Sequence, residues 1–183
     1  MLRCLDILLA AFGLVCSAPI MLLIFIVVLF DTGSPMFMQQ RLGRGMKPFI
    51  LVKFRTMIIG TESVASHLAS SASVTRGGAF LRKTKLDELP QLWNVLKGEM
   101  SLVGPRPNLF NQKELIEQRL ELGVYDVRPG ITGLAQVSDI DMSTPALLAQ
   151  TDAKMINEMS VTNYFKYIFQ TIAGKGAGDR VKD

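Results

Sequence analysis

The sequence predicts an α+β fold that is mainly helical, with a small β-hairpin and an N-terminal membrane helix. Three observations lead to this fold class. Ile7 to Phe30 is a run of 24 residues without a charge. Two short β-prone stretches follow it, and a turn-rich segment joins them. Four later stretches carry helical patterning with recognisable start or stop residues.

Length and composition fit one compact domain attached to an anchor. The chain has 183 residues, and its 20 Lys and Arg against 16 Asp and Glu give a formal net charge of +4. That excess is small and scattered, so we expect no nucleic-acid partner. Cys4 and Cys16 lie in or beside the apolar run, too far apart on one helix to bond to each other, so no oxidising compartment is implied.

The apolar run is long enough to be a membrane segment. As a helix it would reach about 36 Å, against about 30 Å for the hydrocarbon core of a bilayer. Pro19 lies near its middle, where it removes a backbone hydrogen bond, so the helix should bend or break there. The residues leave two arrangements open: a kinked span, or a re-entrant hairpin that enters one leaflet and returns. Ser17 is expected to help satisfy carbonyl groups freed at the bend.

Basic residues follow the run at Arg41, Arg44 and Lys47, which puts the remaining domain on the cytoplasmic side in either arrangement. The stretches "GSPMFMQQRLG" and "KPFILVKFRTM" are predicted to form a hairpin at the membrane exit. The Ser-rich segment "TESVASHLASSASVTRGG" is predicted to be a mobile loop or a weak helix over a site. It holds the single histidine, His67, for which we expect neither a metal cluster nor a catalytic role, because no Cys or second His lies nearby.

The second half of the sequence predicts four helices. The fourth, "TNYFKYIFQTIAG", is short and aromatic, and it fits either an amphipathic helix in the headgroup zone or ordinary core packing. The tail "GKGAGDRVKD" is predicted to be flexible. The first three helices are expected over Phe80 to Leu96, over Leu109 to Leu122 with Gly123 as the stop, and from a Ser143 or Thr144 cap with Pro145 in the first turn to about Met159.

Asp87 and Glu88 form an acidic pair that has two readings. An acid near a helix start accepts backbone N–H bonds and favours the positive end of the helix dipole, so the pair alone fits a helix start before Pro90. Its neighbours favour chemistry. The stretches "SLVGPRPN" and "DVRPGITGLAQV" each present an arginine in a stiff turn that suits a pyrophosphate, and "VKFRTM" adds Lys53 and Arg55. The sequence contains no Walker or G-x-G-x-x-G loop.

These residues also carry a family resemblance. The stretches "KFRTM", "LRKTKLDELPQLWNVLKGEMSLVGPRP" and "DVRPGITGLAQV", after an apolar segment interrupted at proline, resemble the bacterial sugar transferase family over roughly residues 3–137. Members of that family are monotopic phosphoglycosyl transferases, which move a sugar phosphate from a UDP-sugar onto undecaprenyl phosphate. The resemblance implies a re-entrant membrane helix, a cytosolic active site at the bilayer surface among amphipathic interfacial helices, and a requirement for Mg²⁺. It places the protein in the bacterial inner membrane.

The resemblance also implies site residues. It puts the acidic dyad of the family on Asp87 and Glu88, as catalytic residues and as ligands of Mg²⁺. It puts a phosphate-contacting arginine on Arg82. The family often has Ser directly before the breaking proline, whereas here Ala18 stands there and Ser17 is one place earlier. The residues expected to bind the substrate are Lys53, Arg55, Pro105, Arg106, Arg128 and Gln136.

The resulting hypothesis is a two-step transfer in which Asp87 attacks the sugar-linked phosphorus of a UDP-sugar and undecaprenyl phosphate then takes the sugar phosphate. We expect a membrane helix over residues 1–32, a catalytic domain over 33–173 and a flexible tail over 174–183. Two alternatives belong to other classes. One is a membrane-attached glycosyltransferase that releases UDP, and the other is a basic module that binds membranes without catalysis.

Overall fold

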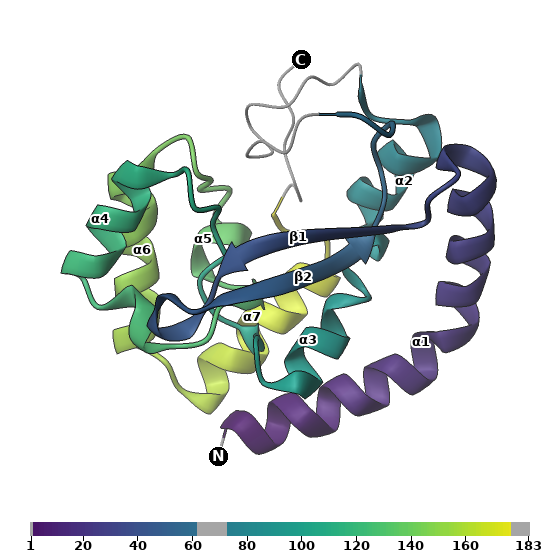
Figure 1. Cartoon of the computed structure of the whole chain (residues 1–183). Coiled ribbons are helices and arrows are strands. Elements are labelled where there is room, and N and C mark those ends of the chain that lie inside the picture. Colours follow the sequence, from purple (N-terminus) through teal and green to yellow (C-terminus); the bar gives the residue numbers. More distant parts are fainter. Residues whose placement is uncertain (1, 62–72, 177–183) are drawn as a thin grey trace.

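The computed structural model describes residues 2–61 and 73–176. It is mainly helical and contains two small two-stranded sheets, which confirms the predicted α+β composition. A long hairpin crosses the middle of the molecule, α4 and α6 lie at one end of it, and α2 with the second half of α1 lies at the other (Figure 1). The longer elements are α1 (Leu2–Thr32), β1 (Met36–Leu42), β2 (Pro48–Phe54), α2 (Arg76–Thr84), α3 (Gln91–Lys97), α4 (Lys113–Glu121), α6 (Pro145–Asn157) and α7 (Val161–Ile172).

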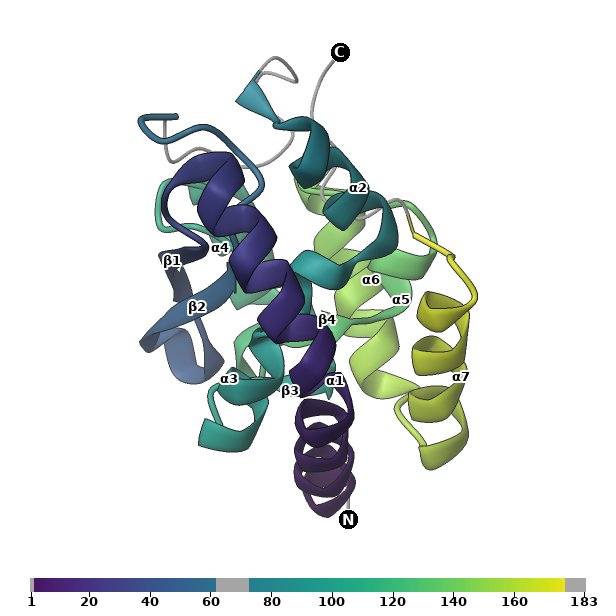
Figure 2. The ribbon, with the colours of Figure 1, turned by 90° about the vertical axis from the view of Figure 1, so that its right-hand side faces the viewer.

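The apolar run forms most of α1, which continues through Pro19 and is sharply bent near its middle (Figures 1 and 2). Of the described residues, this is the one helix long and apolar enough to cross a membrane. Its large apolar side chains are mostly exposed, up to 86% for Phe30. Burial is confined to one stripe, where Ala10 packs against the hairpin and α3, and Ile24 and Val28 pack beside Phe54. A surface this apolar is compatible with membrane association.

Ser17 does not act as predicted. Its hydroxyl donates to the carbonyl of Gly13 at 2.6 Å. Pro19 has no N–H, so the carbonyl that lacks its usual partner is that of Val15, four residues earlier. The Ser17 hydroxyl therefore bonds to the carbonyl of Gly13, one turn earlier in the helix, and not to the Val15 carbonyl that the proline leaves free.

The N-terminal end of α1 is hydrogen-bonded to the globular part of the chain. Asp6 is 3% exposed, and its Oδ1 accepts hydrogen bonds from Ser101 Oγ at 2.9 Å, from the Leu102 amide at 2.9 Å and from the Tyr164 hydroxyl at 2.8 Å. Arg3 donates to carbonyl groups at the end of α3, including that of Val95 at 2.8 Å. Arginine suits the negative end of a helix dipole. Arg3 and Asp6 thus hold the N-terminal end of the apolar helix against the globular domain.

The other end of α1 is held by the same body. Thr75 Oγ1 donates to Asp31 Oδ2 at 2.5 Å, at the start of α2. Arg55 Nε donates to the Ser34 carbonyl at 2.9 Å, and its Nη2 donates to the Met36 carbonyl at 3.2 Å. These bonds fix the junction between α1 and β1.

The predicted hairpin is confirmed. β1 and β2 are antiparallel, with Met36 opposite Phe54 and Leu42 opposite Pro48, and the short 3₁₀ helix η1 (Arg44–Met46) connects them. Asn94 of α3 is fully buried against β2. Its Oδ1 accepts from the Val52 amide at 3.2 Å, and its Nδ2 donates to the Ile50 carbonyl at 2.7 Å. The Asn94 side chain thus forms hydrogen bonds with backbone groups of β2 and holds α3 against the hairpin.

The single helix predicted over Phe80 to Leu96 is wrong, because the structure divides this stretch into three. α2 ends at Thr84, a 3₁₀ turn η4 (Leu86–Glu88) follows, and α3 begins after Pro90. Lys85 at the first break has φ 58°, a left-handed conformation that a continuing α-helix cannot contain. Pro90 has no N–H to bond to the carbonyl four residues earlier, so a helix cannot run through it without a kink or a break. α3 begins at the next residue, Gln91.

A short parallel pair, β3 (Ser101–Val103) with β4 (Gly130–Thr132), was not predicted. It brings the Gly-Pro-Arg-Pro turn beside the Arg-Pro-Gly turn. The two backbones approach so closely that a Cβ on Gly130 would lie 2.0 Å from the nitrogen of Gly104. Glycine is therefore required at this crossing. The turn Leu134–Val137 (α5) follows β4 directly.

The later helices agree with the sequence apart from their ends. The helix predicted over Leu109 to Leu122 begins only at Lys113, and Gly123 beyond it has φ 67°. α6 starts at Pro145 after the Thr144 cap and ends at Asn157. In α7 (Val161–Ile172) Tyr164 is buried, which agrees with core packing, whereas Phe169 is exposed, and the headgroup location stays a prediction. Of the predicted tail, residues 177–183 lie outside the described residues.

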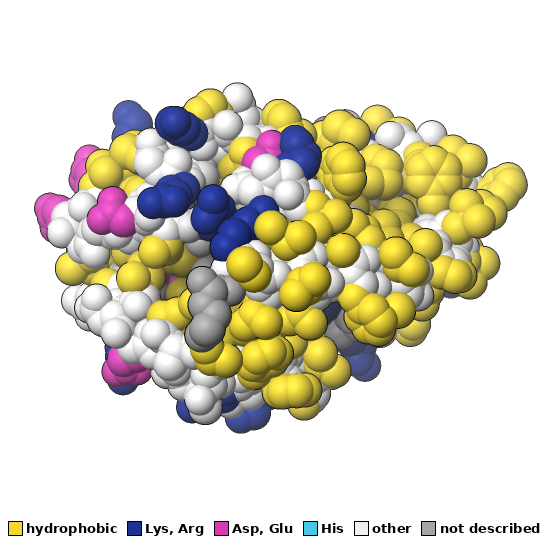
Figure 3. Space-filling view, turned by 90° about the horizontal axis from the view of Figure 1, so that it is seen from below, with side chains coloured by type: hydrophobic (Ala, Val, Ile, Leu, Met, Phe, Trp, Pro, Cys, Tyr) yellow, Lys and Arg dark blue, Asp and Glu magenta, His cyan; other side chains and the backbone are white. Residues whose placement is uncertain are grey.

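The exposed apolar surface is gathered on one side. Seen from below, hydrophobic side chains cover the side of α1, and Lys and Arg side chains gather where that surface ends (Figure 3). This distribution is typical of a protein that sits at a membrane boundary.

Replacement of Asp6 by alanine is expected to destabilise the purified protein. One buried donor, the Tyr164 hydroxyl, and two partly buried donors would lose their acceptor, at a cost of about 3 kcal/mol, which for a chain of this size lowers Tm by about 6–12 °C. Asp6→Asn retains an acceptor oxygen and should lose less. Thermal unfolding in detergent measures both, with Cys4→Ser, at an exposed position two residues away, as the control. Equal Tm values for Asp6→Ala and wild type would show that Asp6 does not hold α1.

Candidate active site

A pocket of about 80 Å³ lies between the hairpin, η4 and the turns that follow β3 and β4. The described polar residues on its wall come from five separate parts of the sequence, which only the folded chain brings together. They are Arg41, Lys53, Lys85, Glu88, Gln91, Arg106, Thr132, Gln136, Asp139, Asp141 and Thr171.

The centre of the pocket is an ion pair between η4 and the turn after β3. Arg106 Nη2 donates to Glu88 Oε1 at 2.8 Å, and Glu88 is 7% exposed. The contact joins the two stretches that the sequence analysis selected separately. No side chain caps α3, whose N-cap is Pro90. The carboxylate of Glu88 thus binds an arginine, and a role as the cap of α3 does not account for it.

Asp87 lies beside the pocket and is 2% exposed, and it is not part of the wall. It belongs to the same 3₁₀ turn as Glu88. Adjacent residues of a turn project in different directions, so the two carboxylates occupy different environments. Arg82, in the last turn of α2, donates through Nε to Thr56 Oγ1 at 2.8 Å. Its guanidinium group is held near the end of β2.

Two cations of the wall come from the hairpin and are buried. Arg41 and Lys53 are each 7% exposed. Arg41 donates to Gln39 Oε1 at 2.5 Å and to the carbonyl of Pro107 at 3.3 Å. The second contact links the hairpin to the turn that carries Arg106. Buried cations need anionic or dipolar partners, so such a wall favours an anionic ligand.

Lys85 adds a cation whose charge depends on pH. Burial lowers the pKa of its ammonium group below the ordinary lysine value, while the carboxylate of Glu88 opposes this shift and the guanidinium group of Arg106 adds to it. Lys85 Nζ also donates to the carbonyl of Lys175 at 2.5 Å. The lysine therefore loses its proton at a lower pH than a free lysine does.

The remaining predicted site residues lie in three places. Gln136 is on the pocket wall, where its Nε2 donates to the carbonyl of Gly104 at 3.3 Å and its Oε1 has no hydrogen-bond partner among the described residues. Pro105 and Arg128 line a second cavity of about 280 Å³ near the first turn of α1, and Arg128 Nε donates to the carbonyl of Gly98 at 2.8 Å. Arg55 lies at the junction of α1 and β1.

Sequence reasoning missed several wall residues, namely Arg41, Lys85, Gln91, Asp139 and Asp141. Arg41 was used only as a sign of membrane orientation. A signal existed for Lys85, because it stands two residues before Asp87 in the same charged stretch. His67, for which we predicted no catalytic role, lies outside the described residues.

The donor set at η4 fits Mg²⁺ in a limited way. The described residues contain no cluster of three or more His, Cys, Asp or Glu side chains that could form a complete metal site. Mg²⁺ is commonly bound by one or two carboxylates, with waters and substrate phosphates as further ligands. Asp87 and Glu88 can supply those carboxylates, so the residues present fit an ion that is held jointly with a diphosphate.

Known proteins resemble this chain along most of its length. Residues 1–175 match the family described as bacterial sugar transferase. The uncharacterized sugar transferase EpsL of Bacillus subtilis is 44% identical over 137 residues, which are 74% of this chain and 67% of that protein. The UDP-glucose:undecaprenyl-phosphate glucose-1-phosphate transferase of Caulobacter vibrioides is 37% identical over 93% of this chain and 67% of its own length.

A further relative is longer than this chain. The undecaprenyl-phosphate galactose phosphotransferase of Salmonella typhimurium is 34% identical over 92% of this chain but only 39% of that protein. The chain spans about two fifths or less of the length of several relatives that it matches. The family match nevertheless covers nearly the whole chain, including the hairpin, the η4 turn and the two arginine-bearing turns that meet at the pocket. The chain belongs to the bacterial sugar transferase family.

Proposed function

We propose that the protein transfers a sugar 1-phosphate from a UDP-sugar to undecaprenyl phosphate, giving undecaprenyl diphosphate sugar and UMP. The observation that carries this proposal is the Arg106–Glu88 pair in a pocket walled by further cations, beside an exposed apolar helix. A diphosphate needs several cations, and a polyprenyl acceptor needs a membrane surface. The named relatives from Caulobacter and Salmonella act on undecaprenyl phosphate, which supports the same acceptor here.

In the first step, an oxygen of Asp87 attacks the sugar-linked phosphorus of the UDP-sugar. The new bond joins the carboxylate oxygen to phosphorus, and the bond from that phosphorus to the bridging oxygen breaks, so UMP leaves with the electron pair. In the second step, a phosphate oxygen of undecaprenyl phosphate attacks the same phosphorus. The bond to Asp87 then breaks and the carboxylate is regenerated. The acceptor is already an anion, so no strong general base is required.

The other residues orient and neutralise charge. Arg106 and Lys53 line the pocket where the diphosphate would lie, and Arg82 would steady the transferring phosphate. Mg²⁺ held by Asp87, Glu88 and the diphosphate would mask the negative charge that otherwise repels an attacking carboxylate. Glu88 would orient the acceptor or share the metal, and its bond to Arg106 keeps both groups at the reacting phosphorus.

The position of α1 supports a re-entrant arrangement in the bacterial inner membrane, with the catalytic domain on the cytoplasmic face. Asp6 near one end of α1 and Asp31 near the other both bond to the same globular body. A straight spanning helix would carry these ends to opposite sides of the bilayer. The bend at Pro19 lets both remain on one side. The amphipathic α7, with Phe169 exposed, would lie in the headgroup zone.

The alternatives differ in their products. A glycosyltransferase moves the sugar alone and releases UDP. A module that only binds membranes releases no nucleotide, and its binding would fall with salt and need neither Mg²⁺ nor UDP-sugar. A panel of UDP-sugars incubated with undecaprenyl phosphate and Mg²⁺, scored for UMP and UDP, separates the three and identifies the sugar.

Asp87→Asn is expected to lower turnover by about 10³-fold or more while the fold is retained. The substitution keeps the shape of a buried side chain but removes the attacking oxygen. Without the lipid acceptor, wild-type protein incubated with UDP-sugar and Mg²⁺ should gain the mass of a sugar phosphate, and the variant should not. Intact-protein mass spectrometry measures this.

Glu88→Gln is the matched comparison, since it also removes one carboxylate from η4. Its turnover should fall as well, but the adduct should still form, because Asp87 is intact. Peptide mapping then locates the adduct. An adduct on Glu88, or a folded Asp87→Asn protein with near wild-type turnover, would contradict the assignment of the nucleophile.

The re-entrant arrangement predicts that both ends of α1 react from the cytoplasmic face. Cys4 is exposed and can serve as one probe, and Lys47→Cys in the hairpin turn can serve as the other, in a Cys16→Ala background. A membrane-impermeant maleimide should label both only in inverted vesicles. Reactivity of Cys4 from the periplasmic side alone would mean a true span. Pro19→Ala, which restores a straight helix, should favour that span and depress activity.

Lys85→Arg is expected to extend activity to higher pH. The pKa of Lys85 is below the ordinary value, so its positive charge is lost as the pH rises through that lowered pKa, and kcat/KM should fall there. Arginine remains charged throughout the accessible range, so the fall should move to higher pH. Lys85→Met should lower kcat/KM by roughly 10-fold at neutral pH, and its kcat/KM should not fall further as the pH rises through the pKa of Lys85. Identical pH profiles for all three proteins would show that Lys85 does not bind the substrate.

A further inference from the structure

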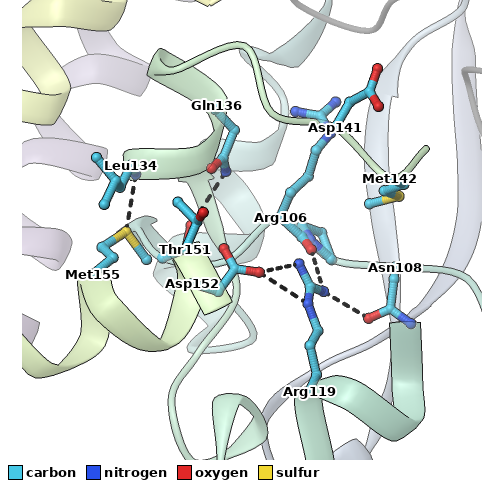
Figure 4. Close-up of polar contacts among 12 residues, drawn as sticks. Arg106, Asn108, Arg119, Leu134, Gln136, Asp141, Met142, Thr151, Asp152 and Met155 are labelled. Carbon is cyan, nitrogen blue, oxygen red and sulfur yellow. Dashed lines mark hydrogen bonds and ion pairs between the residues drawn. The ribbon is translucent and has the colours of Figure 1, made fainter. Parts of the chain in front are cut away.

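Behind the pocket wall lies a buried ion pair that the proposed reaction does not use. Arg119 of α4 and Asp152 of α6 are 1% and 0% exposed. Arg119 donates to Asp152 Oδ2 through Nε at 3.1 Å and through Nη2 at 2.7 Å (Figure 4). The pair joins two helices at the end of the molecule away from α2.

The third nitrogen of the same guanidinium group points to the turn that carries Arg106. Arg119 Nη1 donates to the carbonyl oxygen of Arg106 at 2.9 Å and to Asn108 Oδ1 at 2.9 Å (Figure 4). Asn108 is fully buried, its Oδ1 also accepts from the Tyr125 hydroxyl at 3.0 Å, and its carbonyl accepts from the Leu42 amide at 3.0 Å. Arg119 therefore binds the backbone on one side of Pro107, at Arg106, and the side chain on the other, at Asn108.

Stability alone does not explain this arrangement. Taking two charges out of water costs several kcal/mol per ion, and replacing a buried pair by apolar residues is often neutral or stabilising. The desolvation is also incompletely offset, because Asp152 Oδ1 has no hydrogen-bond partner among the described residues. An arginine is suited to this place for another reason. Its planar fork binds a carboxylate and a carbonyl group at once, in fixed directions.

We propose that Arg119 and Asp152 are positioning residues for Arg106. Arg119 fixes the carbonyl group of Arg106, so that the side chain of Arg106 leaves the turn in the direction of Glu88 Oε1, and Asp152 fixes the guanidinium group of Arg119. This inference rests on the proposed function, in which Arg106 binds the phosphate that is transferred. The pair acts through the backbone and touches neither substrate nor Glu88.

The test is a double variant, Arg119→Met with Asp152→Leu, which removes both charges together and leaves no buried charge unpaired. The variant is expected to fold with a Tm equal to or above that of wild type. Its kcat for UMP release should nevertheless fall by about 10²-fold, with a smaller change in KM, since a displacement of about 1 Å at a catalytic group has this order of effect. A structural pair would leave the kcat of folded protein unchanged.

A readout independent of activity separates this proposal from the proposed function. Hydrogen exchange of peptides that cover residues 104–109 should be about 10-fold faster in the double variant, because the turn loses its anchor. Arg119→Lys is the second variant. It keeps the charge beside Asp152, but a single ammonium group cannot reproduce the fork, so kcat should fall and exchange should rise there too. Lys97→Met, which removes an exposed ion pair with Glu99, is the control and should change neither.

The outcomes are distinct. Wild-type kcat and wild-type exchange in the folded double variant, or in Arg119→Lys should the double variant not fold, would overturn the positioning role. Absence of UMP release from the wild type would overturn the proposed function, while the exchange measurement would still decide whether Arg119 holds the turn.

Discussion

The carboxylate of Asp6 is the contact on which the placement of the rest of the molecule depends. It is buried where the N-terminal part of α1 meets β3 and α7, and it accepts three hydrogen bonds from those elements. A residue near the start of an apolar helix is thereby part of the globular core. Because Asp31 at the far end is bonded to α2, the helix is attached at both ends to one body and free only along its exposed side. This exposed apolar side is compatible with membrane association.

The same attachment explains where the pocket lies. The hairpin follows α1, and Arg55 donates to the carbonyl of Ser34 at their junction. The two strands carry Arg41 and Lys53 to the wall of the pocket. In the proposed reaction, a soluble UDP-sugar and a membrane-bound acceptor meet at one phosphorus, so the pocket would have to lie near the bilayer and be open to water. The wall carries the cations Arg41, Lys53, Lys85 and Arg106 beside the acids Glu88, Asp139 and Asp141. Several cations on one wall suit a diphosphate better than a neutral sugar.

Much of the fold was predictable because its signals are local. The hairpin follows from β-prone stretches around a turn, α6 from Thr144 and Pro145, and the bend of α1 from Pro19. The predictions that were wrong or missing also have physical causes. The division of the predicted helix over Phe80 to Leu96 depends on a left-handed Lys85, and lysine carries no sequence sign of that conformation. The β3–β4 pair joins residues about 30 positions apart, which no local pattern reveals.

The site was predictable only in part, for the same reason. Glu88 and Arg106 stand in motifs that can be selected one by one, but their contact was not predicted. Arg128 stands in an equally suggestive motif, yet its Nε donates to the end of α3 and its side chain lines another cavity. The difference is set by the direction in which each turn leaves the parallel pair. Residue type and spacing do not determine that direction.

That direction has to be fixed by more than the strands themselves. β3 and β4 have three residues each, and so short a pair has few hydrogen bonds with which to hold the turns that follow. The close contact of Gly104 with Gly130 limits the separation of the two backbones, but it does not orient a side chain two residues further on. The carbonyl of Arg106 needs a partner from outside the sheet, and Arg119 is the side chain that reaches it. We therefore attribute the buried charge that supports this turn to the placement of the proposed phosphate-binding arginine on so short a sheet.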